Sequence, residues 1–298
     1  MKTKNQVFDR ITARVIEALE SGTMPWRRGW DNSGGGFPHN AVTGKPYRGM
    51  NVWLLMMAAE ERDLESTGWI TPNQAKKFEL DFKGAKTEEV VFWKRSERTD
   101  EETGKKSTFM WAKSYRVINL SECRGEGLEK LKGHVPVGLP EEMDTPDDLA
   151  IAVAKALELE VKHQGTKAFY QPTKDFICMP KLSKFSSDVT YRATLLHEAI
   201  HATGHKSRAD RNLKGRFGDE SYAAEELIAE LGSTYLQEFL GIDMDLPNHA
   251  SYIASWLKVL KNDSKAIMTA ASQAQKAVDY LLQRLDIVEA PVYLEEAA

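Results

Sequence analysis

The segment LLHEAIHATGH, residues 195–205, constrains the fold more than any other part of this 298-residue chain. It holds three of the seven histidines, and His197 and His201 are four residues apart. On an α-helix this spacing puts both imidazoles on one face, one turn apart, where two neutral ring nitrogens can reach one Zn²⁺. The segment therefore predicts a helix that carries a metal site, with further ligands supplied from elsewhere.

Glu198 lies between the two histidines and is expected to act as a general base, not as a ligand. It points toward the same cleft, where it can take a proton from water held at the metal and pass it to a leaving amine. The alternative is a helix with two ordinary surface or core histidines. Leu195 and Ile200 flank the polar face, and a carboxylate-rich helix follows, so the sequence favours the metal site.

The third ligand is expected from a second helix, SYAAEELIAELGSTYL at residues 221–236. Glu226 is favoured, and Glu230 shares its face and could orient a histidine. Glu225 points about 100° away from Glu226 and would need a different rotation of the helix. His205 is disfavoured because three successive turns of one helix diverge too far to close a tetrahedral site. One divalent ion is expected, with zinc first and manganese as the alternative.

Charge is distributed unevenly along the chain. Residues 1–125 hold 21 Lys and Arg against 17 Asp and Glu, whereas the remainder holds 19 against 27. Six of the seven tryptophans also lie in that first part. A basic, aromatic-rich half joined to an acidic half indicates nucleic acid as a partner near the N-terminal end.

The stretch 21–48 has many glycines and prolines and little periodicity, so we expect a long irregular loop there. Cations can follow the phosphates of a single strand while flat rings stack on its bases, and duplex DNA buries those base faces. Trp26, Trp30 and Tyr47 are expected to be exposed, whereas Trp53 is expected in the core. The candidate DNA-binding residues are Trp26, Arg27, Arg28, Trp30, Lys45, Tyr47 and Arg48.

Periodicity and punctuation predict an α+β chain with two domains. The first, residues 1–135, is an α+β DNA-binding domain, and the second, residues 145–298, is mostly helical with a small sheet. Strands are expected at 89–96 and 108–120, as a hairpin, and within 167–180. Helices are expected at 5–20, 49–62, 71–79, 145–159, 188–204, 221–240, 248–261 and 264–286.

The cysteines and the hydropathy of the sequence indicate where in the cell the protein is expected. Cys123 and Cys178 form no CxxC pattern, which predicts a reduced, cytoplasmic setting. The longest apolar run, near residues 52–59, is too short to span a bilayer, and no secretory signal is recognisable. No membrane partner is expected.

These segments together resemble the ArdC-type antirestriction proteins of conjugative plasmids along essentially the whole chain. PWRRGW, AVTGKPYRGMNVWLL, WITPNQAKKFE, VVFWK and YRVINLSEC resemble that family's single-stranded-DNA-binding domain. ATLLHEAIHATGHKSR, YAAEELIAELGSTYL and YIASWLKVLKNDSKAI resemble its zincin-like metallopeptidase domain. The resemblance implies protection of incoming plasmid DNA from restriction, with His197 and His201 as ligands and Glu198 as the catalytic base.

Two functional hypotheses remain open at this point. In the first, an antirestriction protein binds single-stranded DNA and cleaves peptide bonds, with DNA-bound host proteins as candidate substrates. In the second, the protein coats single-stranded DNA without catalysis, and its metal site is structural or vestigial. A metal-dependent nuclease is disfavoured because phosphoryl-transfer sites are commonly rich in carboxylates, whereas this one is rich in imidazole.

Overall fold

The computed structural model describes residues 4–22, 37–99, 106–131, 138–213, 219–242 and 250–287. These residues form two compact units, one that contains residues 4–7 and 37–131, and another that contains residues 8–22 and the described residues from 138 onward. Both units combine helices with a small sheet, so the predicted α+β class with two parts is confirmed.

The first unit is a four-stranded sheet with helices. Its elements are β1 (His39–Asn40), α2 (Met50–Glu61), β2 (Gly68–Ile70), α3 (Pro72–Lys77), β3 (Thr87–Thr99) and β4 (Lys106–Asn119). The strand order is β1-β2-β4-β3, in which β1 and β2 are parallel and the other neighbours antiparallel. Trp53 and Trp69 are almost fully buried in its core, so the expectation for Trp53 is confirmed.

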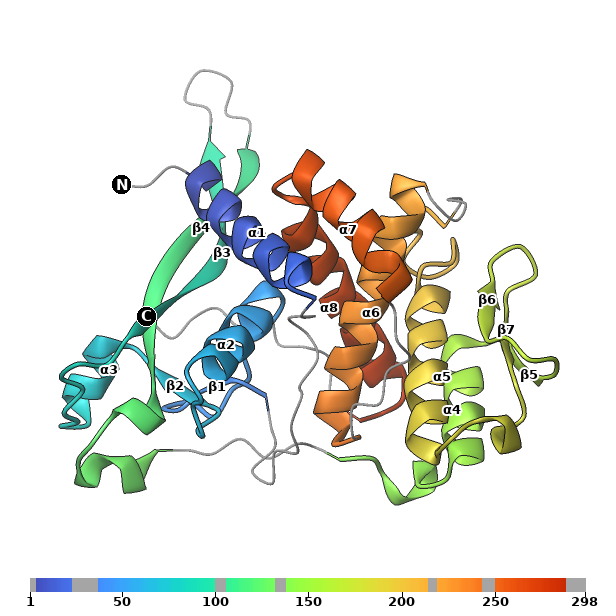
Figure 1. Cartoon of the computed structure of the whole chain (residues 1–298), viewed down its shortest axis with the longest axis horizontal. Helices are drawn as coiled ribbons and strands as arrows, with labels where there is room; N and C mark the ends of the chain where they lie inside the picture. Colours follow the sequence, from blue (N-terminus) through green and yellow to red (C-terminus); the bar gives the residue numbers. More distant parts are fainter. Residues whose placement is uncertain are drawn as a thin grey trace. The chain divides into compact units, whose positions relative to one another are not determined.

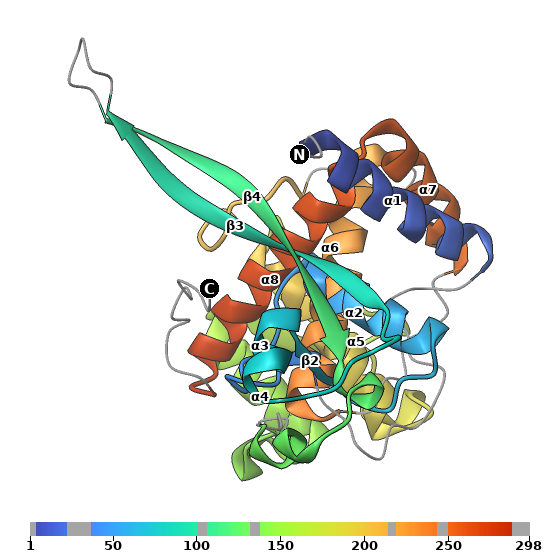
Figure 2. The ribbon, with the colours of Figure 1, turned by 90° about the vertical axis from the view of Figure 1, so that its left-hand side faces the viewer.

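A long hairpin dominates this sheet. The β3 and β4 strands pair continuously from Thr87 with Ile118 to Thr99 with Lys106, and they form a twisted ribbon (Figure 2). The buried Asn51 of α2 ties the helix to this hairpin, since its amide donates to the Val91 carbonyl and accepts from the Val91 N–H, both at 2.8 Å. Two hydrogen bonds from one side chain fix α2 against β3.

The second unit is mostly helical, with a three-stranded sheet beside the helices (Figure 1). Its elements are α4 (Pro146–Leu157), β5 (Glu160–His163), β6 (Phe169–Gln171), β7 (Phe176–Met179), α5 (Asp188–Thr203), α6 (Glu220–Leu240), α7 (Ala250–Asn262) and α8 (Ala266–Arg284). The strand order is β5-β7-β6, so β6 is an edge strand. The helix α6 contacts α5, α7 and α8, and it therefore lies at the centre of the helical part.

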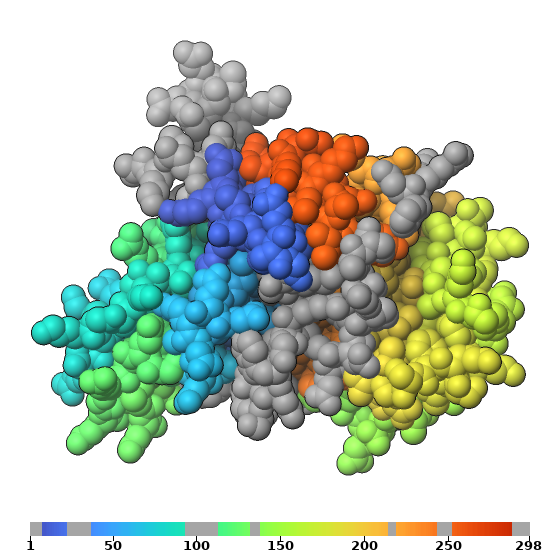
Figure 3. All heavy atoms as spheres, in the orientation of Figure 1, coloured from blue at the N-terminus to red at the C-terminus, as the bar shows by residue number. Residues whose placement is uncertain are grey.

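The N-terminal helix α1 (Lys4–Glu20) is divided between the two compact units, and the expected domain division of 1–135 and 145–298 stays a prediction. From Phe8 onward it belongs to the second unit. Its apolar stripe is buried, the Thr12 hydroxyl donates to the Ser264 carbonyl at 2.6 Å, and α1 lies against α7 on the surface (Figure 3). An amphipathic pattern predicts that a helix buries one face, but it does not predict which other element covers that face.

The predicted helices and strands are otherwise confirmed within a few residues. The short strands β1, β2 and β5 were missed, because two to four residues carry too little periodicity. Within the expected loop 21–48, residues 23–36 lie outside the described part of the chain. Among the described helices, none combines the length and the apolar content needed to cross a bilayer.

Candidate metal centre

The helix α5 presents the HEAIH segment as a rigid, buried element. Ser187 caps its N-terminus, since the serine hydroxyl accepts a hydrogen bond from the Thr190 N–H at 3.1 Å. Leu195, Leu196, Ala199 and Ile200 are completely buried on the packed side. The remaining face carries the two histidines and Glu198, which line a cavity of about 520 Å³.

A close approach of two helices brings the third side chain to this face. Gly232 of α6 lies against Ile200 of α5, and a Cβ atom at position 232 would come within 2.9 Å of the Ile200 side chain. The missing side chain lets the helices pack at short range. Glu226, about two turns earlier on α6, then reaches the histidines.

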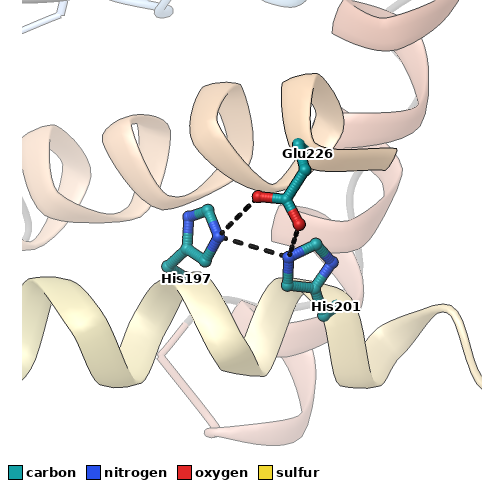
Figure 4. A group of neighbouring side chains, drawn as sticks. All are labelled: His197, His201 and Glu226. Atoms are coloured by element: carbon teal, nitrogen blue, oxygen red, sulfur yellow. Dashed lines mark hydrogen bonds and ion pairs between the residues drawn. The ribbon is translucent and has the colours of Figure 1, made fainter. Parts of the chain in front are cut away.

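The three side chains point their ligand atoms toward one another (Figure 4). The two Nε2 atoms of His197 and His201 are 3.2 Å apart. The Glu226 oxygens lie 3.6 Å from the His197 Nε2 and 3.5 Å from the His201 Nε2. Ligands that bind Zn²⁺ tetrahedrally at about 2.0–2.1 Å lie about 3.3 Å apart, so this donor set fits a divalent ion.

Each imidazole has a carboxylate near its Nδ1 atom, on the side of the ring away from the other histidine. The His201 Nδ1–H donates to Glu225 at 3.2 Å, and Glu230, which is completely buried, lies 3.9 Å from the His197 Nδ1. Such partners fix the ring orientation and leave each Nε2 atom to face the ion. Of the three glutamates considered from the sequence, Glu226 is therefore brought to the ligand position, while Glu225 and Glu230 support the histidines.

Arg211 holds Glu225 in place. Its guanidinium donates two hydrogen bonds to the Glu225 carboxylate, at 2.7 and 3.0 Å, and others to the Thr203 hydroxyl and the Ile200 carbonyl at the end of α5. No sequence pattern singled out Arg211, because the contact depends on how the chain folds back after α5.

The charges of the site are strongly coupled. Burial alone would lower the pKa of His201, but hydrogen bonds to Glu225 and Glu226 raise it to about 10. Burial alone would raise the pKa of Glu226, but its hydrogen bonds with His197 and His201 hold it well below the usual value. The buried carboxylates therefore attract positive charge to this point, which a proton or a divalent cation can supply.

Glu198 lies beside the three side chains, not among them. Its carboxylate accepts a hydrogen bond from the Tyr170 N–H of the edge strand β6 at 2.8 Å. His205, disfavoured as a ligand, is turned away, since its ring pairs with Ser207 at 2.8 Å. The arrangement separates a carboxylate that can move protons from the residues that can hold an ion.

Two tyrosines that sequence reasoning missed also line the cavity. Tyr222 of α6 and Tyr252 of α7 have their hydroxyls 3.3 Å apart. Burial, the hydrogen bond to Tyr252 and the nearby Glu226 raise the pKa of Tyr222. Tyr222 precedes Glu226 by four residues, a helical spacing that could have indicated a shared face.

The structure describes only part of the candidate DNA-binding set. Trp26, Arg27, Arg28 and Trp30 lie outside the described residues. Lys45 and Arg48 are exposed. The expected exposure of Tyr47 is wrong, because its side chain is buried, and that burial raises its pKa to about 12 despite a hydrogen bond with Asn40. A tyrosine in a glycine-rich segment can still fold back onto the core.

Comparisons with known proteins identify relatives of both parts of the chain. Residues 5–118 match the N-terminal domain of the antirestriction factor ArdC, and residues 149–273 match a zincin-like metallopeptidase domain. The uncharacterised protein y4eC of Sinorhizobium fredii is 34% identical over 94% of this chain and 92% of its own length. A DNA primase TraC of Escherichia coli is 35% identical over 94% of this chain, which spans 27% of that relative's length.

Solved structures extend the comparison to the fold. The metal-free antirestriction ArdC protein from plasmid R388 is 37% identical, with a TM-score of 0.77 over 94% of this chain and 97% of its own. Its Mn(II)-bound structure is 35% identical, with a TM-score of 0.76 over 93% of this chain and 97% of its own. The chain belongs to the ArdC family of antirestriction proteins.

Proposed function

We propose that the second unit is a metal-dependent peptidase within an antirestriction protein that acts on DNA entering a cell by conjugation. The observation that carries the proposal is the grouping of His197, His201 and Glu226 at ligand distances, with Glu198 beside them in one cavity. The proposed ion is zinc, with manganese as the alternative, since a relative binds Mn(II). DNA-bound host proteins are the proposed substrates.

In the proposed peptidase, the ion site, Glu198 and Tyr170 have different roles. A divalent ion at this site would polarise a peptide carbonyl and lower the pKa of water. Glu198 accepts the proton of the attacking water and transfers it to the leaving amine. The Tyr170 N–H donates to the Glu198 carboxylate at 2.8 Å and so holds that base beside the edge strand β6.

The variant Glu198→Gln tests the peptidase. The amide keeps the shape and can still accept from the Tyr170 N–H, so metal content and stability should be unchanged. Cleavage of DNA-bound proteins, or self-cleavage, should fall about 10²–10⁴-fold, because the base is lost. Glu160→Gln, at a side chain that is 69% exposed in the same unit, is the matched control. Undiminished cleavage by a folded, metal-loaded Glu198→Gln variant would contradict the proposal.

We also propose that the first unit binds single-stranded DNA, on the observation of an exposed ring beside a half-buried one on its sheet. Phe92 is 43% exposed and meets Tyr115 edge to face at 5.4 Å. The Lys113 ammonium lies 4.7 Å from the centre of the Tyr115 ring. The register pairs Phe92 with Lys113, two residues from Tyr115 on the same face. Rings combined with cations are what a single strand requires.

Binding to matched single and double strands, followed by fluorescence anisotropy, tests this second activity. The double change Phe92→Ala, Tyr115→Ala should weaken binding to the single strand, since each stacked base contributes about 1–3 kcal/mol. Ile151→Ala, which removes an exposed apolar side chain from the other unit, is the control. Equal affinity of the unchanged protein for both strands would count against the activity itself.

Measuring antirestriction in the same variants separates the two functional hypotheses. If proteolysis protects the DNA, Glu198→Gln should abolish protection while the affinity for single-stranded DNA persists. If coating of the DNA protects it, the Phe92 and Tyr115 changes should abolish protection, and Glu198→Gln should retain it.

A further inference from the structure

The strand that holds the proposed base is short and is paired along one edge. β6 has three residues and forms its ladder of hydrogen bonds with β7. At the opposite edge the Tyr170 N–H donates to Glu198. A group that positions a catalytic side chain must itself be fixed to within about 0.5 Å, so a strand this short needs further contacts to hold the carboxylate in place.

The side chain of Tyr170 supplies the first of these contacts. Its hydroxyl donates to Asp175 at 2.7 Å, and Asp175 ends the turn that joins β6 to β7. Burial and this bond raise the pKa of Tyr170, so the proton stays on the hydroxyl and the carboxylate accepts it. The bond closes the turn from one side to the other and fixes the Tyr170 ring with it.

Arg208 joins this turn to two helices. Its almost completely buried guanidinium donates to both oxygens of Asp175 and, at 3.3 Å, to the Tyr170 hydroxyl. It also donates to the carbonyls of Ala202 in α5, at 2.7 Å, and of Leu157 in α4, at 2.8 Å. These bonds use all five N–H donors of a guanidinium, which lysine, with three donors on one nitrogen, could not reproduce.

We propose that Arg208 and Asp175 are positioning residues that hold Glu198, through Tyr170, where it can take a proton from water. The inference rests on the proposed peptidase function. The contacts form a closed circuit, which leaves α5 at Ala202 and returns to α5 at Glu198. One oxygen of Glu198 accepts from the Tyr170 N–H, and the other is left for water. Arg208 and Asp175 are not among the described residues that line the cavity, so their effect on the base passes through Tyr170.

The variant Asp175→Asn in the full-length, Zn²⁺-loaded protein tests the effect on catalysis. Asparagine tolerates the left-handed backbone there, but its neutral oxygen accepts weaker hydrogen bonds than a carboxylate. For the DNA-bound protein cleaved in the Glu198→Gln assay, kcat should fall by up to about 10²-fold, the loss that a small misplacement can cause. KM and metal affinity should not change, because the contacts with substrate and ion remain.

Thr145→Ala is the matched control, since it removes the N-cap of α4 and so lowers the stability of the same unit at a distance from Tyr170. Its kcat should equal that of the unchanged protein when both are assayed well below their melting temperatures. An equal fall in kcat in Thr145→Ala and Asp175→Asn would mean that lost stability is the cause, and it would overturn the inference.

Double changes separate positioning of the base from a general structural effect. Tyr170→Phe removes the other end of the bond to Asp175 and keeps the backbone N–H, so the two changes together should lower kcat no further than the larger single loss. In the Glu198→Gln background, Asp175→Asn should leave the residual cleavage as it is, because no base remains to be positioned. Losses that multiply in either pair would refute the proposed circuit.

Amide exchange gives a readout that does not depend on catalysis. With ¹⁵N-labelled tyrosine, the signal of the Tyr170 N–H is the one that Tyr170→Phe removes. In Asp175→Asn and in Arg208→Lys this amide should exchange about tenfold faster, the factor expected when one hydrogen bond to a charged group is weakened, and in Thr145→Ala it should not. Unchanged exchange in the first two variants would overturn the inference. If the unchanged protein cleaves nothing, the peptidase fails, and exchange alone decides whether the circuit holds Glu198.

Discussion

Individual residues show how the side chains of the candidate metal centre are held in place. Both histidines have a carboxylate at the Nδ1 atom, and the partner of His201 is itself fixed by Arg211. The side chains that orient the imidazoles are therefore as buried as the imidazoles themselves. A site of this kind loses metal affinity when the carboxylates that orient its histidines are changed, even if all three candidate ligands remain.

Glu225→Gln should lower metal affinity by up to about 10–100-fold, the range found when the partner of a ligating histidine is altered. The amide can still accept from the His201 Nδ1–H, but it carries no charge to make the imidazole more basic. Competition with a chelating dye measures the affinity, and Glu220→Gln at the exposed start of α6 serves as the control. Unchanged affinity in Glu225→Gln would show that the carboxylate does not tune the site.

Asp175 belongs to a second network of side chains, which Tyr170 links to the metal centre because its N–H donates to Glu198. It forms an ion pair with Arg208, which is almost completely buried, and accepts from the Tyr170 hydroxyl at 2.7 Å. Burial alone would raise the pKa of Asp175, but the bonds from Arg208 and Tyr170 hold it below the usual value. A carboxyl with a lowered folded-state pKa stabilises the protein above its unfolded pKa, near 4, and loses that effect as the pH falls.

Asp175→Asn should therefore reduce stability at neutral pH, by about 1–3 kcal/mol, because Arg208 loses its counter-ion. Asparagine tolerates the left-handed backbone at this position, where φ is 50°. Urea unfolding between pH 7 and 2 should show the difference from the unchanged protein shrinking below about pH 4. A difference that is constant over this range would refute the assigned pKa direction.

At the scale of elements, most helices could be predicted from the sequence, and the exceptions have physical reasons. The stretches with caps and clear periodicity, such as α3 and α4, lie within a few residues of their expected positions. The rotation of α6 could not be predicted, because residues 225–237 are all buried and no exposed stripe marks one face. This is why Glu225, Glu226 and Glu230 could not be separated by pattern alone.

Gly232 supplies the element-scale prediction, since it sets how closely α6 approaches α5. Alanine improves helix propensity by about 1 kcal/mol, but its Cβ would lie within 2.9–3.0 Å of three carbons of the completely buried Ile200. We expect the overlap to prevail, so that Gly232→Ala lowers both stability and metal affinity by pushing Glu226 away from the histidines.

Ile200→Val removes one of those three carbons and should restore part of both losses in the Gly232→Ala background. A double-mutant cycle on denaturant midpoints and metal affinity measures the coupling between the two positions. Strictly additive effects would mean that the helices do not meet at this contact.

At the scale of the whole molecule, the chain carries two units with separate cores, and sequence order does not map simply onto them. The α1 helix begins the chain yet packs in the second unit, with Glu20 paired to Lys261 at 2.6 Å. Contacts between residues so far apart in sequence leave no local pattern, so the sequence could not predict which residues α1 would contact, and the division at 1–135 and 145–298 stays a prediction. The difference in net charge between residues 1–125 and the rest of the chain could be counted directly from the sequence, because it does not depend on which residues contact one another.

This division makes a prediction about where a bound ion stabilises the molecule. The candidate ligands lie on α5 and α6, so an ion held by them would bind only while these two helices are packed together. At a free metal concentration of about 100 times Kd, an opening that breaks the site becomes roughly 100-fold rarer. Hydrogen–deuterium exchange should slow by up to that factor in peptides from α5 and α6 when Zn²⁺ or Mn²⁺ is added.

Peptides from β2 and β4 of the first unit should exchange at their original rates, and the double change His197→Ala, His201→Ala should abolish the effect. Equal slowing in both units would mean that the ion acts elsewhere or on the whole molecule, and it would contradict a single centre between α5 and α6.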